Sequence, residues 1–224
     1  MPVRPRCVLC LPLLLLSLLA VASPRPTAAA SKCEAAKGFS PKVHPEAHAA
    51  RLDGEIVIDG RIEDKAWSQA TSLSGFTEIE PGDQAPPDAC TEVLVGYDDT
   101  HLYVAFRAHD PAPSSIRASL RNRDEIFGDD WVGLIVDPYG DAAQAYEIFA
   151  NPYGIQGDLL MSSSGGEDIG FDLVYQSNGQ ITKEGYQVEM AIPFSSLRFP
   201  TQPVQEWSLT FIRTRPRSTR QQYS

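Results

Sequence analysis

The chain of 224 residues carries 29 acidic and 19 basic side chains, which gives a formal net charge of −10 at pH 7. This charge excludes binding to nucleic acids or anionic lipids through bulk electrostatics, because the Coulomb interaction has the wrong sign. The length fits one domain with a sizeable hydrophobic core. After residue 30, no stretch is long and apolar enough to cross a bilayer as a helix. We therefore expect a soluble domain that binds no nucleic acid.

Residues 1–30 have the pattern of a signal peptide. Two early arginines form a basic start, an apolar, leucine-rich run covers residues 7–22, and small residues follow up to Ala30. The apolar run is shorter than the ~20 residues that a membrane-spanning helix needs, which favours cleavage over a retained anchor. We predict a cut after Ala30, with a cut after Ala22 as the alternative. The mature protein is then exported to the periplasm, the outer membrane or the extracellular space.

Residues 31–51 show no sustained hydrophobic period, so we interpret them as a linker. Two cysteines, Cys33 and Cys90, remain after the predicted cleavage. In an oxidising compartment we expect them to form one disulfide bond, and two free thiols are the alternative. A zinc site is not expected, because no histidine lies at ligand spacing from a cysteine.

From residue 55 onward, short β-type runs alternate with turn residues, which is typical of a sandwich or a barrel. Alternation along residues 91–97 and 102–108 places one side of each strand in a core and the other in solvent. We predict an all-β fold, a jelly-roll-like antiparallel β-sandwich of two sheets with one or two short helical turns. The turns are expected at residues 63–70 and 193–199, with a short helix at 114–120. The expected strands are residues 56–58, 76–80, 91–97, 102–108, 131–136, 145–150, 155–161, 171–176, 186–192 and 207–213.

We place this sandwich at residues 52–215. Beyond the last expected strand, arginines recur up to Arg220 without any stop signal. We therefore expect residues 216–224 to begin a downstream region that this chain lacks, and we expect the chain to be a fragment of a longer protein.

Four stretches together resemble a known family. Residues 58–67, Ile-Asp-Gly-Arg-Ile-Glu-Asp-Lys-Ala-Trp, and residues 97–104, Tyr-Asp-Asp-Thr-His-Leu-Tyr-Val, are similar to segments of family-9-like carbohydrate-binding modules. The acidic and aromatic run over residues 124–158 and the stretch 185–199 are similar to the modules that precede a β-barrel in bacterial outer-membrane proteins. The resemblance covers about residues 50–215.

The resemblance implies a β-sandwich that binds a glycan, often in proteins linked to polysaccharide breakdown. It also implies a downstream outer-membrane β-barrel domain, absent from this chain, as a partner. Tyr175 and Tyr186 stand where the resemblance leads us to expect tryptophans, which is a departure from the pattern.

Three acidic residues, Asp124, Asp129 and Asp130, lie within seven residues just before an expected strand. Such close carboxylates repel one another unless a cation neutralises them. Calcium prefers oxygen ligands on loops and is one candidate cofactor for these three residues. Arg121 and Arg123 are neighbouring cations, so an arginine–aspartate network is an alternative, and direct sugar contact is another.

Sugar recognition needs an aromatic ring against the C–H face of the sugar and planar polar groups for its hydroxyls. Trp131, Tyr139 and Tyr153 supply rings at turns or strand ends, where a ring can stand clear of the core, and packing is the alternative. Trp67 is interpreted as a core residue, because alanines flank it at helical spacing. The predicted polar contacts to the sugar come from Arg121, Arg123, Asn151 and Gln156.

No catalytic residue is predicted. The sequence has no Gly-x-Ser-x-Gly elbow, no phosphate-binding glycine loop and no isolated glutamate in an apolar loop. We therefore predict a carbohydrate-binding module without catalysis of its own. The alternatives are an interaction or capping domain of an outer-membrane β-barrel protein and a component of a glycoside hydrolase.

Overall fold

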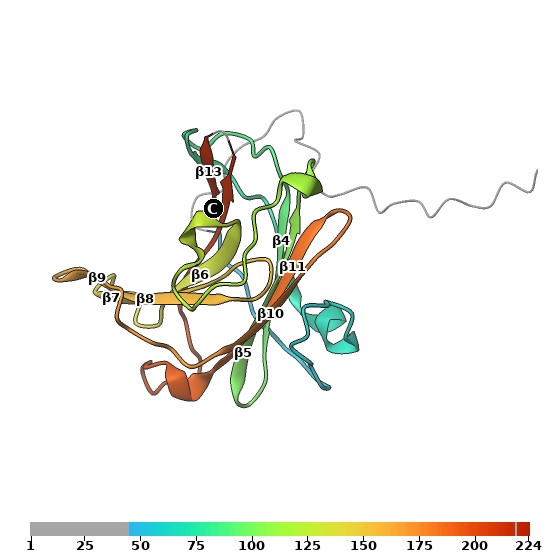
Figure 1. Cartoon of the computed structure of the whole chain (residues 1–224). Helices are drawn as coiled ribbons and strands as arrows, with labels where there is room; N and C mark the ends of the chain where they lie inside the picture. Colours follow the sequence, from blue (N-terminus) through green and yellow to red (C-terminus); the bar gives the residue numbers. More distant parts are fainter. Residues whose placement is uncertain (1–44, 218) are drawn as a thin grey trace, which may run out of the picture. The chain divides into compact units, whose positions relative to one another are not determined.

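Alternating apolar residues on the central strands do face a second sheet, as the sequence predicts. The computed structural model describes residues 45–217 and 219–224, in which two β-sheets pack face to face (Figure 1). Regular helix is limited to four short 3-10 turns among these residues. The prediction of an all-β sandwich with short helical turns is confirmed.

The first sheet, sheet A, has the strand order β1-β4-β5-β11-β10, with β2 also paired to β4. All of its pairs are antiparallel except the short parallel pair of β1 and β4. Its strands are β1 (Ala50–Arg51), β2 (Thr71–Leu73), β4 (Thr91–Tyr97), β5 (His101–His109), β10 (Gln176–Ile181) and β11 (Gly185–Pro193).

The second sheet, sheet B, is antiparallel throughout and has the strand order β3-β13-β12-β6-β7-β8-β9. Its strands are β3 (Glu78–Glu80), β6 (Trp131–Asp137), β7 (Gln144–Ala150), β8 (Gln156–Ser162), β9 (Gly166–Asp168), β12 (Ser208–Pro216) and β13 (Arg220–Tyr223). The 3-10 turns are η1 (Lys65–Gln69), η2 (Pro113–Ser115), η3 (Ile126–Gly128) and η4 (Phe194–Ser196).

The main hydrophobic core lies between the two sheets. Every second residue of the central strands points inward, so Val104 and Phe106 of sheet A meet Leu134 and Ile148 of sheet B with no exposed surface. Burying a side chain of this size stabilises the fold by about 1.5–3 kcal/mol. The core therefore fixes which side of each strand faces outward.

The outer face of sheet A is covered by the chain segment that precedes β2. Figure 1 shows η1 on the side of sheet A that faces away from sheet B. Trp67 of η1 is 3% exposed and packs with Leu52, Leu94 and Ala105 in a second cluster. The prediction that Trp67 is a core residue is confirmed, and this face of the molecule is closed.

Four expectations about local structure are wrong. Residues 56–58 and 171–175 form no strand, and the partner of β11 is β10, so Asn178 and Gly179 lie in a strand rather than in a loop. The short helix expected at 114–120 is only the turn η2. Residues 220–223 form β13, which pairs with β12 and β3, so the second sheet extends beyond residue 215; the downstream region stays a prediction. For β10, pairing with β11 decided the structure.

Several predictions fall outside the described residues. These include the signal peptide, its cleavage after Ala30, and most of the linker over residues 31–51. Cys90 is disulfide-bonded, but Cys33 is not among the described residues, so the pairing of these two cysteines stays a prediction. Among the described residues, no helix is long and apolar enough to span a membrane.

Candidate carbohydrate-binding surface

The outer face of sheet B differs from that of sheet A, because part of it is left open. Strand register places Ile135 opposite Glu147 and Thr210, and places Ala145 opposite Met161, all on the side away from the core. Thr210 is exposed, and Ile135, Ala145 and Met161 are half-buried. We call the surface formed by these five residues the open face.

Glu147 of β7 is the unusual residue of the open face. Its side chain is only 9% exposed, yet its carboxylate makes no hydrogen bond or ion pair with any described residue. The neighbours across the strands are Ile135 and Leu159, which offer no polar group. Burial raises the pKa of Glu147, and the charge of Glu167 raises it further. The Glu147 oxygens are not among the buried side-chain atoms that lack a partner, so they keep contact with solvent, from which a ligand can approach them.

One end of this face is closed by aromatic rings rather than by polar groups. Trp131, Phe149 and Phe127 contact one another edge to face, with ring centroids 4.8–5.9 Å apart. Gly133 permits this arrangement, because a Cβ atom there would collide with the Phe149 ring. Phe127 is half-buried and packs on Phe149 of β7.

Trp131 does not stand clear of the core, and that expectation is wrong. The side chain is 4% exposed and its indole Nε1 is buried without a hydrogen-bond partner. The strand end at residue 131 is covered by η3, which the sequence pattern did not reveal. Its ring is therefore not available to stack on a sugar in this structure.

Tyr139 and Tyr153 are exposed, as predicted, but they cannot form one site. They are 54% and 42% exposed, in the turns at the two ends of β7. A strand of seven residues separates these turns by about 20 Å. Asn151 is fully buried and organises the second turn, because its side-chain oxygen accepts hydrogen bonds from the backbone N–H groups of Tyr153 and Ile155, both 3.0 Å long.

Arg123 and Gln156, predicted as sugar contacts, contact each other. The guanidinium of Arg123 donates hydrogen bonds to the side-chain oxygen of Gln156, to Asp158 and to the carbonyl of Leu173. It also lies over the ring of Tyr175, 5.3 Å from the centroid. These contacts attach the loop before η3 to β8, so both side chains have a structural role here.

The predicted metal ligands do not gather into one group. Asp129 accepts hydrogen bonds from the backbone of Ser119 and from the amide of Asn151, while Arg121 lies 3.8 Å away. Asp124 instead lies beside Asp158 and Asp172. Of the alternatives that the sequence left open, this arrangement favours the arginine–aspartate network. Calcium binding itself stays a prediction.

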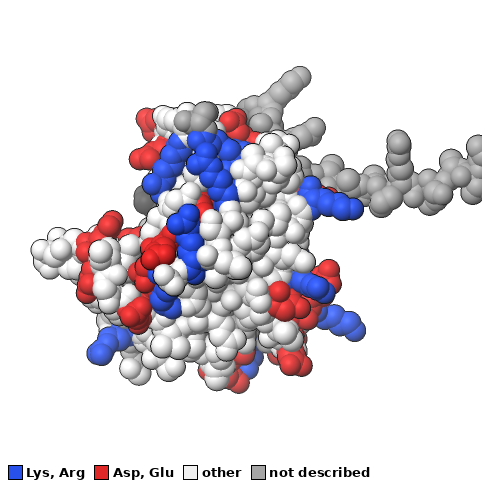
Figure 2. Space-filling view, viewed as in Figure 1, with Lys and Arg blue, Asp and Glu red and all other residues white. Residues whose placement is uncertain are grey.

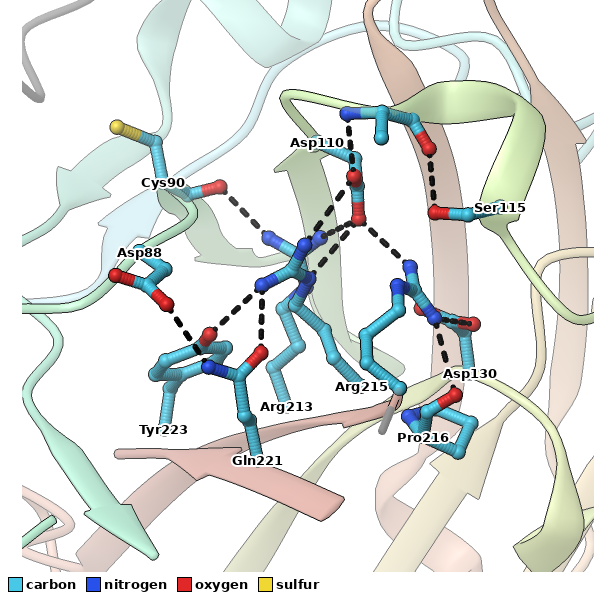
Figure 3. Close-up of polar contacts among 12 residues, drawn as sticks. Asp88, Cys90, Asp110, Ser115, Asp130, Arg213, Arg215, Pro216, Gln221 and Tyr223 are labelled. Atoms are coloured by element: carbon cyan, nitrogen blue, oxygen red, sulfur yellow. Dashed lines mark hydrogen bonds and ion pairs between the residues drawn. The ribbon is translucent and has the colours of Figure 1, made fainter. Parts of the chain in front are cut away.

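Asp130 belongs to a second and larger network at the end of the sandwich that holds β13. Arg217 donates to both carboxylate oxygens of Asp130, at 2.8 and 3.0 Å. The side chain of Asp110 is fully buried. Its Oδ2 lies 2.9 Å from Nε of Arg215, 2.8 Å from Nη2 of Arg217 and 3.6 Å from Nη2 of Arg213. Figure 3 shows how Arg213 and Arg215 converge on Asp110, and Figure 2 shows basic side chains gathered at this end of the molecule.

This network links residues that the sequence separates by about a hundred positions. Burial would raise the pKa of Asp110, but hydrogen bonds from Arg215 and from the backbone of Ala112 hold that pKa below its ordinary value. Arg213 is fully buried, and burial lowers its pKa. No local sequence motif around Asp110 predicts that its carboxylate lies among three arginines.

A hollow of about 600 Å³ opens elsewhere between the two sheets. Tyr146 and Phe171 form an aromatic wall, with ring centroids 5.9 Å apart, and Asp172 and Arg198 contribute polar groups. The hydroxyl oxygen of Tyr146 accepts a hydrogen bond from the backbone of Arg198. We call this space the aromatic hollow, and its lining combines apolar rings with polar side chains.

The family of the chain follows from residues 58–212. Over this range, most of the described sandwich, the sequence matches the model of the carbohydrate family 9 binding domain-like family. The chain belongs to that family. The family-9-like part of the resemblance is therefore confirmed.

Curated relatives of this family 9 domain are large enzymes. The chain is 28% identical over 151 residues to endo-1,4-beta-xylanase C of Paenibacillus barcinonensis and 29% identical over 153 residues to an exoglucanase of Acetivibrio thermocellus. These alignments cover 67% and 68% of the chain but only 13% of each relative. The chain thus spans about an eighth of the length of the curated relatives it matches.

Solved structures support the fold. A protein from Bacteroides uniformis superposes with a TM-score of 0.61 at 11% identity, over 78% of this chain and 86% of that one. A carbohydrate binding module family 9 from Caldicellulosiruptor kristjanssonii, in complex with cellotriose, superposes with a TM-score of 0.53 at 17% identity, over 78% and 82% of the two chains.

Sequence reasoning missed Glu147, although a signal was present. Residues 145–150 were expected to form a strand, in which positions 145, 147 and 149 share one side. A single acid on an otherwise apolar side of a strand is the pattern that marks such a residue. What the sequence did not show is which outer face is covered.

Proposed function

We propose that this domain binds a glycan on the open face of sheet B, with Glu147 as the acceptor of sugar hydroxyls. The carboxylate has two oxygens and can accept hydrogen bonds from two neighbouring hydroxyls at once. The half-buried side chains of Ile135 and Met161 provide the apolar surface for the C–H face of a sugar ring.

One observation carries the proposal. In this domain of a carbohydrate-binding family, Glu147 lies on the outer side of sheet B, is 9% exposed, and has no hydrogen-bond or ion-pair partner among the described residues. The relatives named xylanase or exoglucanase, and the cellotriose complex of a family 9 module, support neutral plant polysaccharides as the first ligands to test.

Isothermal titration calorimetry with cello- and xylo-oligosaccharides tests the proposal. We expect millimolar to high-micromolar affinity, because each hydroxyl that exchanges water for protein contributes only ~1 kcal/mol. Glu147→Gln should weaken binding about tenfold or more, since hydrogen bonds to a charged acceptor contribute ~1.5–3 kcal/mol. The matched control is Glu63→Gln, which changes an exposed glutamate on the other side of the molecule.

Phe171→Ala distinguishes the open face from the aromatic hollow. If the open face is the site, this variant binds like the wild type. If Phe171→Ala abolishes binding while Glu147→Gln leaves it intact, the aromatic hollow is the site and our assignment is wrong. Tyr139→Ala and Tyr153→Ala test the turn tyrosines in the same titration, because both rings remain exposed and available.

We further propose that the domain acts outside the cytoplasm, as one part of a larger protein. The signal-peptide pattern of residues 1–30 supports export to the periplasm, the outer membrane or the extracellular space. The resemblance to modules that precede an outer-membrane β-barrel, and the enzymes among the relatives, support two kinds of partner domain. Protease accessibility of the protein in intact and lysed cells tests the location.

A further inference from the structure

A separate hollow lies beside the arginine network. It measures about 460 Å³ and combines two cationic side chains with an amide, a hydroxyl, a carboxylate and two proline rings. We call it the arginine hollow. Its lining residues are Pro81, Asp88, Pro111, Arg215, Arg217, Thr219 and Gln221.

The ion pairs beside the arginine hollow involve more guanidinium groups than carboxylates, while Asp88 and Glu78 lie nearby and each accept a hydrogen bond from Gln221. Three guanidinium groups, those of Arg213, Arg215 and Arg217, share the two carboxylates of Asp110 and Asp130. No ion pair joins a described arginine to Asp88, whose carboxylate accepts a hydrogen bond from Gln221 instead. Charge buried in a protein is costly unless it is compensated, so one further anion at this place is favourable.

Hydrogen-bond donors in the network are also left over. The Nε atoms of Arg213 and Arg217 are buried and have no acceptor among the described residues, and Nη2 of Arg213 makes no hydrogen bond either. Asp110 is shared by all three arginines. If an anion bound Arg215 and Arg217, Asp110 would be free to neutralise more of the charge of Arg213, the most buried of the three arginines.

The other polar side chains that line the hollow determine which kind of anion fits it. The Gln221 amide, the Thr219 hydroxyl and the Asp88 carboxylate can donate or accept hydrogen bonds with hydroxyl groups. A simple inorganic anion would use only the arginines and would leave the other polar side chains of the lining without a partner. A sugar acid has one carboxylate for the arginines and several hydroxyls for the other three side chains.

We infer that the arginine hollow is a subsite for a uronate residue of an acidic glycan. The sugar carboxylate binds the guanidinium groups of Arg215 and Arg217, for which planar bidentate pairing is the preferred geometry. The ring hydroxyls contact Gln221, Thr219 and Asp88. This subsite is independent of Glu147 and of the neutral-glycan binding proposed for the open face.

Titration with sodium D-glucuronate, with D-glucose as the neutral counterpart, tests the inference. We expect glucuronate to bind about tenfold or more tightly than glucose, and to lose affinity as salt screens the arginines. Thr219→Lys should strengthen glucuronate binding and Thr219→Asp should weaken it, each about threefold. Thr219 is exposed and makes no side-chain contact in the network, so both variants should fold. Arg217→Gln should abolish binding, with melting curves to confirm that this variant is folded.

Two further experimental results would overturn the inference. If acetate or inorganic phosphate binds as tightly as glucuronate, the hollow is a general anion site and not a sugar-acid subsite. If glucuronate binds no better than glucose, or if the two Thr219 variants do not differ, the inference is wrong. Glu147→Gln should leave glucuronate binding unchanged, which separates a failure here from a failure of the proposed function.

Discussion

Two buried glutamates on the outer faces of the two sheets have opposite surroundings. Glu189 of β11, with no exposed surface, accepts hydrogen bonds from the backbone N–H groups of Gly60 and Arg61 and from the indole of Trp67, 2.7–3.1 Å long. Glu147 of β7 is nearly as buried and has no partner among the described residues. The same side chain therefore organises a covered face in one sheet and has no protein partner in the other, where its oxygens keep contact with solvent.

This difference explains what the family motif does. The segment Asp59-Gly60-Arg61 wraps its backbone donors around Glu189, and Gly60 has a φ of +87°, which favours glycine. A Cβ atom on Gly60 would also lie 2.9 Å from the backbone of Gly179 in β10. The motif is thus a structural attachment of the N-terminal segment to sheet A. Our proposal places ligand binding on the other sheet.

The largest effect is expected from removing the cover of sheet A. Trp67→Ala should lower the free energy of unfolding by ~3–5 kcal/mol, because it empties a buried site and removes a donor from Glu189. Urea unfolding measures this change. Tyr153→Ala, an exposed aromatic, should change stability by less than about 0.5 kcal/mol. Equal losses in the two variants would contradict our view of the covered face.

Glu189→Gln should cost about 2–3 kcal/mol, somewhat less than the loss of Trp67. The glutamine amide replaces one acceptor oxygen by a donor, so at least one of the N–H groups of Asp59, Gly60, Arg61 or Trp67 loses its partner. Urea unfolding again gives the value. A neutral result would mean that these hydrogen bonds do not hold the segment in place.

Glu147→Gln should have the opposite sign and stabilise the fold by about 1 kcal/mol at pH 7, since it removes a buried charge without a partner. Burial raises the pKa of Glu147 above its unfolded value, so the folded state holds its proton more tightly. Wild-type stability from this group is therefore present at low pH and is lost as pH rises through the raised pKa.

The advantage of the variant should accordingly shrink on acidification. Melting curves at pH 7 and at about pH 3.5, below the ordinary glutamate pKa of about 4.3, give the comparison. Glu63→Gln serves as the exposed control. A Glu147→Gln variant that is less stable than the wild type at pH 7 would show that this carboxylate does have a partner.

The comparison of the two sheets also shows which strands and contacts the sequence could predict. The strands at 91–97 and 102–108 were predictable, because a buried side imposes a period of two on the side chains. β10 was not, because it is a polar edge strand without a fully buried residue and is held by its hydrogen bonds to β11. Which outer face is covered, and where Asp110 meets three arginines, depends on contacts between distant parts of the chain.

The predicted site residues show the same difference between local and long-range effects. Tyr139 and Tyr153 are exposed because turn chemistry is local. Trp131 is buried because a turn four residues earlier folds over it, which local pattern does not reveal. The partners of the charged side chains were the hardest to predict. The sequence pattern grouped Asp124 with two neighbours, whereas the structure groups it with Asp158 and Asp172.

The smallest effect concerns calcium at this last group. Arg123 already lies among the three carboxylates, 3.2 Å from Asp172, and pairs with Asp158. We therefore expect neither calcium nor a chelator to change the melting temperature of the wild type. Arg123→Gln removes the arginine charge and leaves oxygen ligands that lie within 4.8 Å of one another, so calcium should raise the melting temperature of this variant by mass action. A calcium-dependent rise in the melting temperature of the wild type would instead mean that the arginine does not take the place of a metal ion in this group.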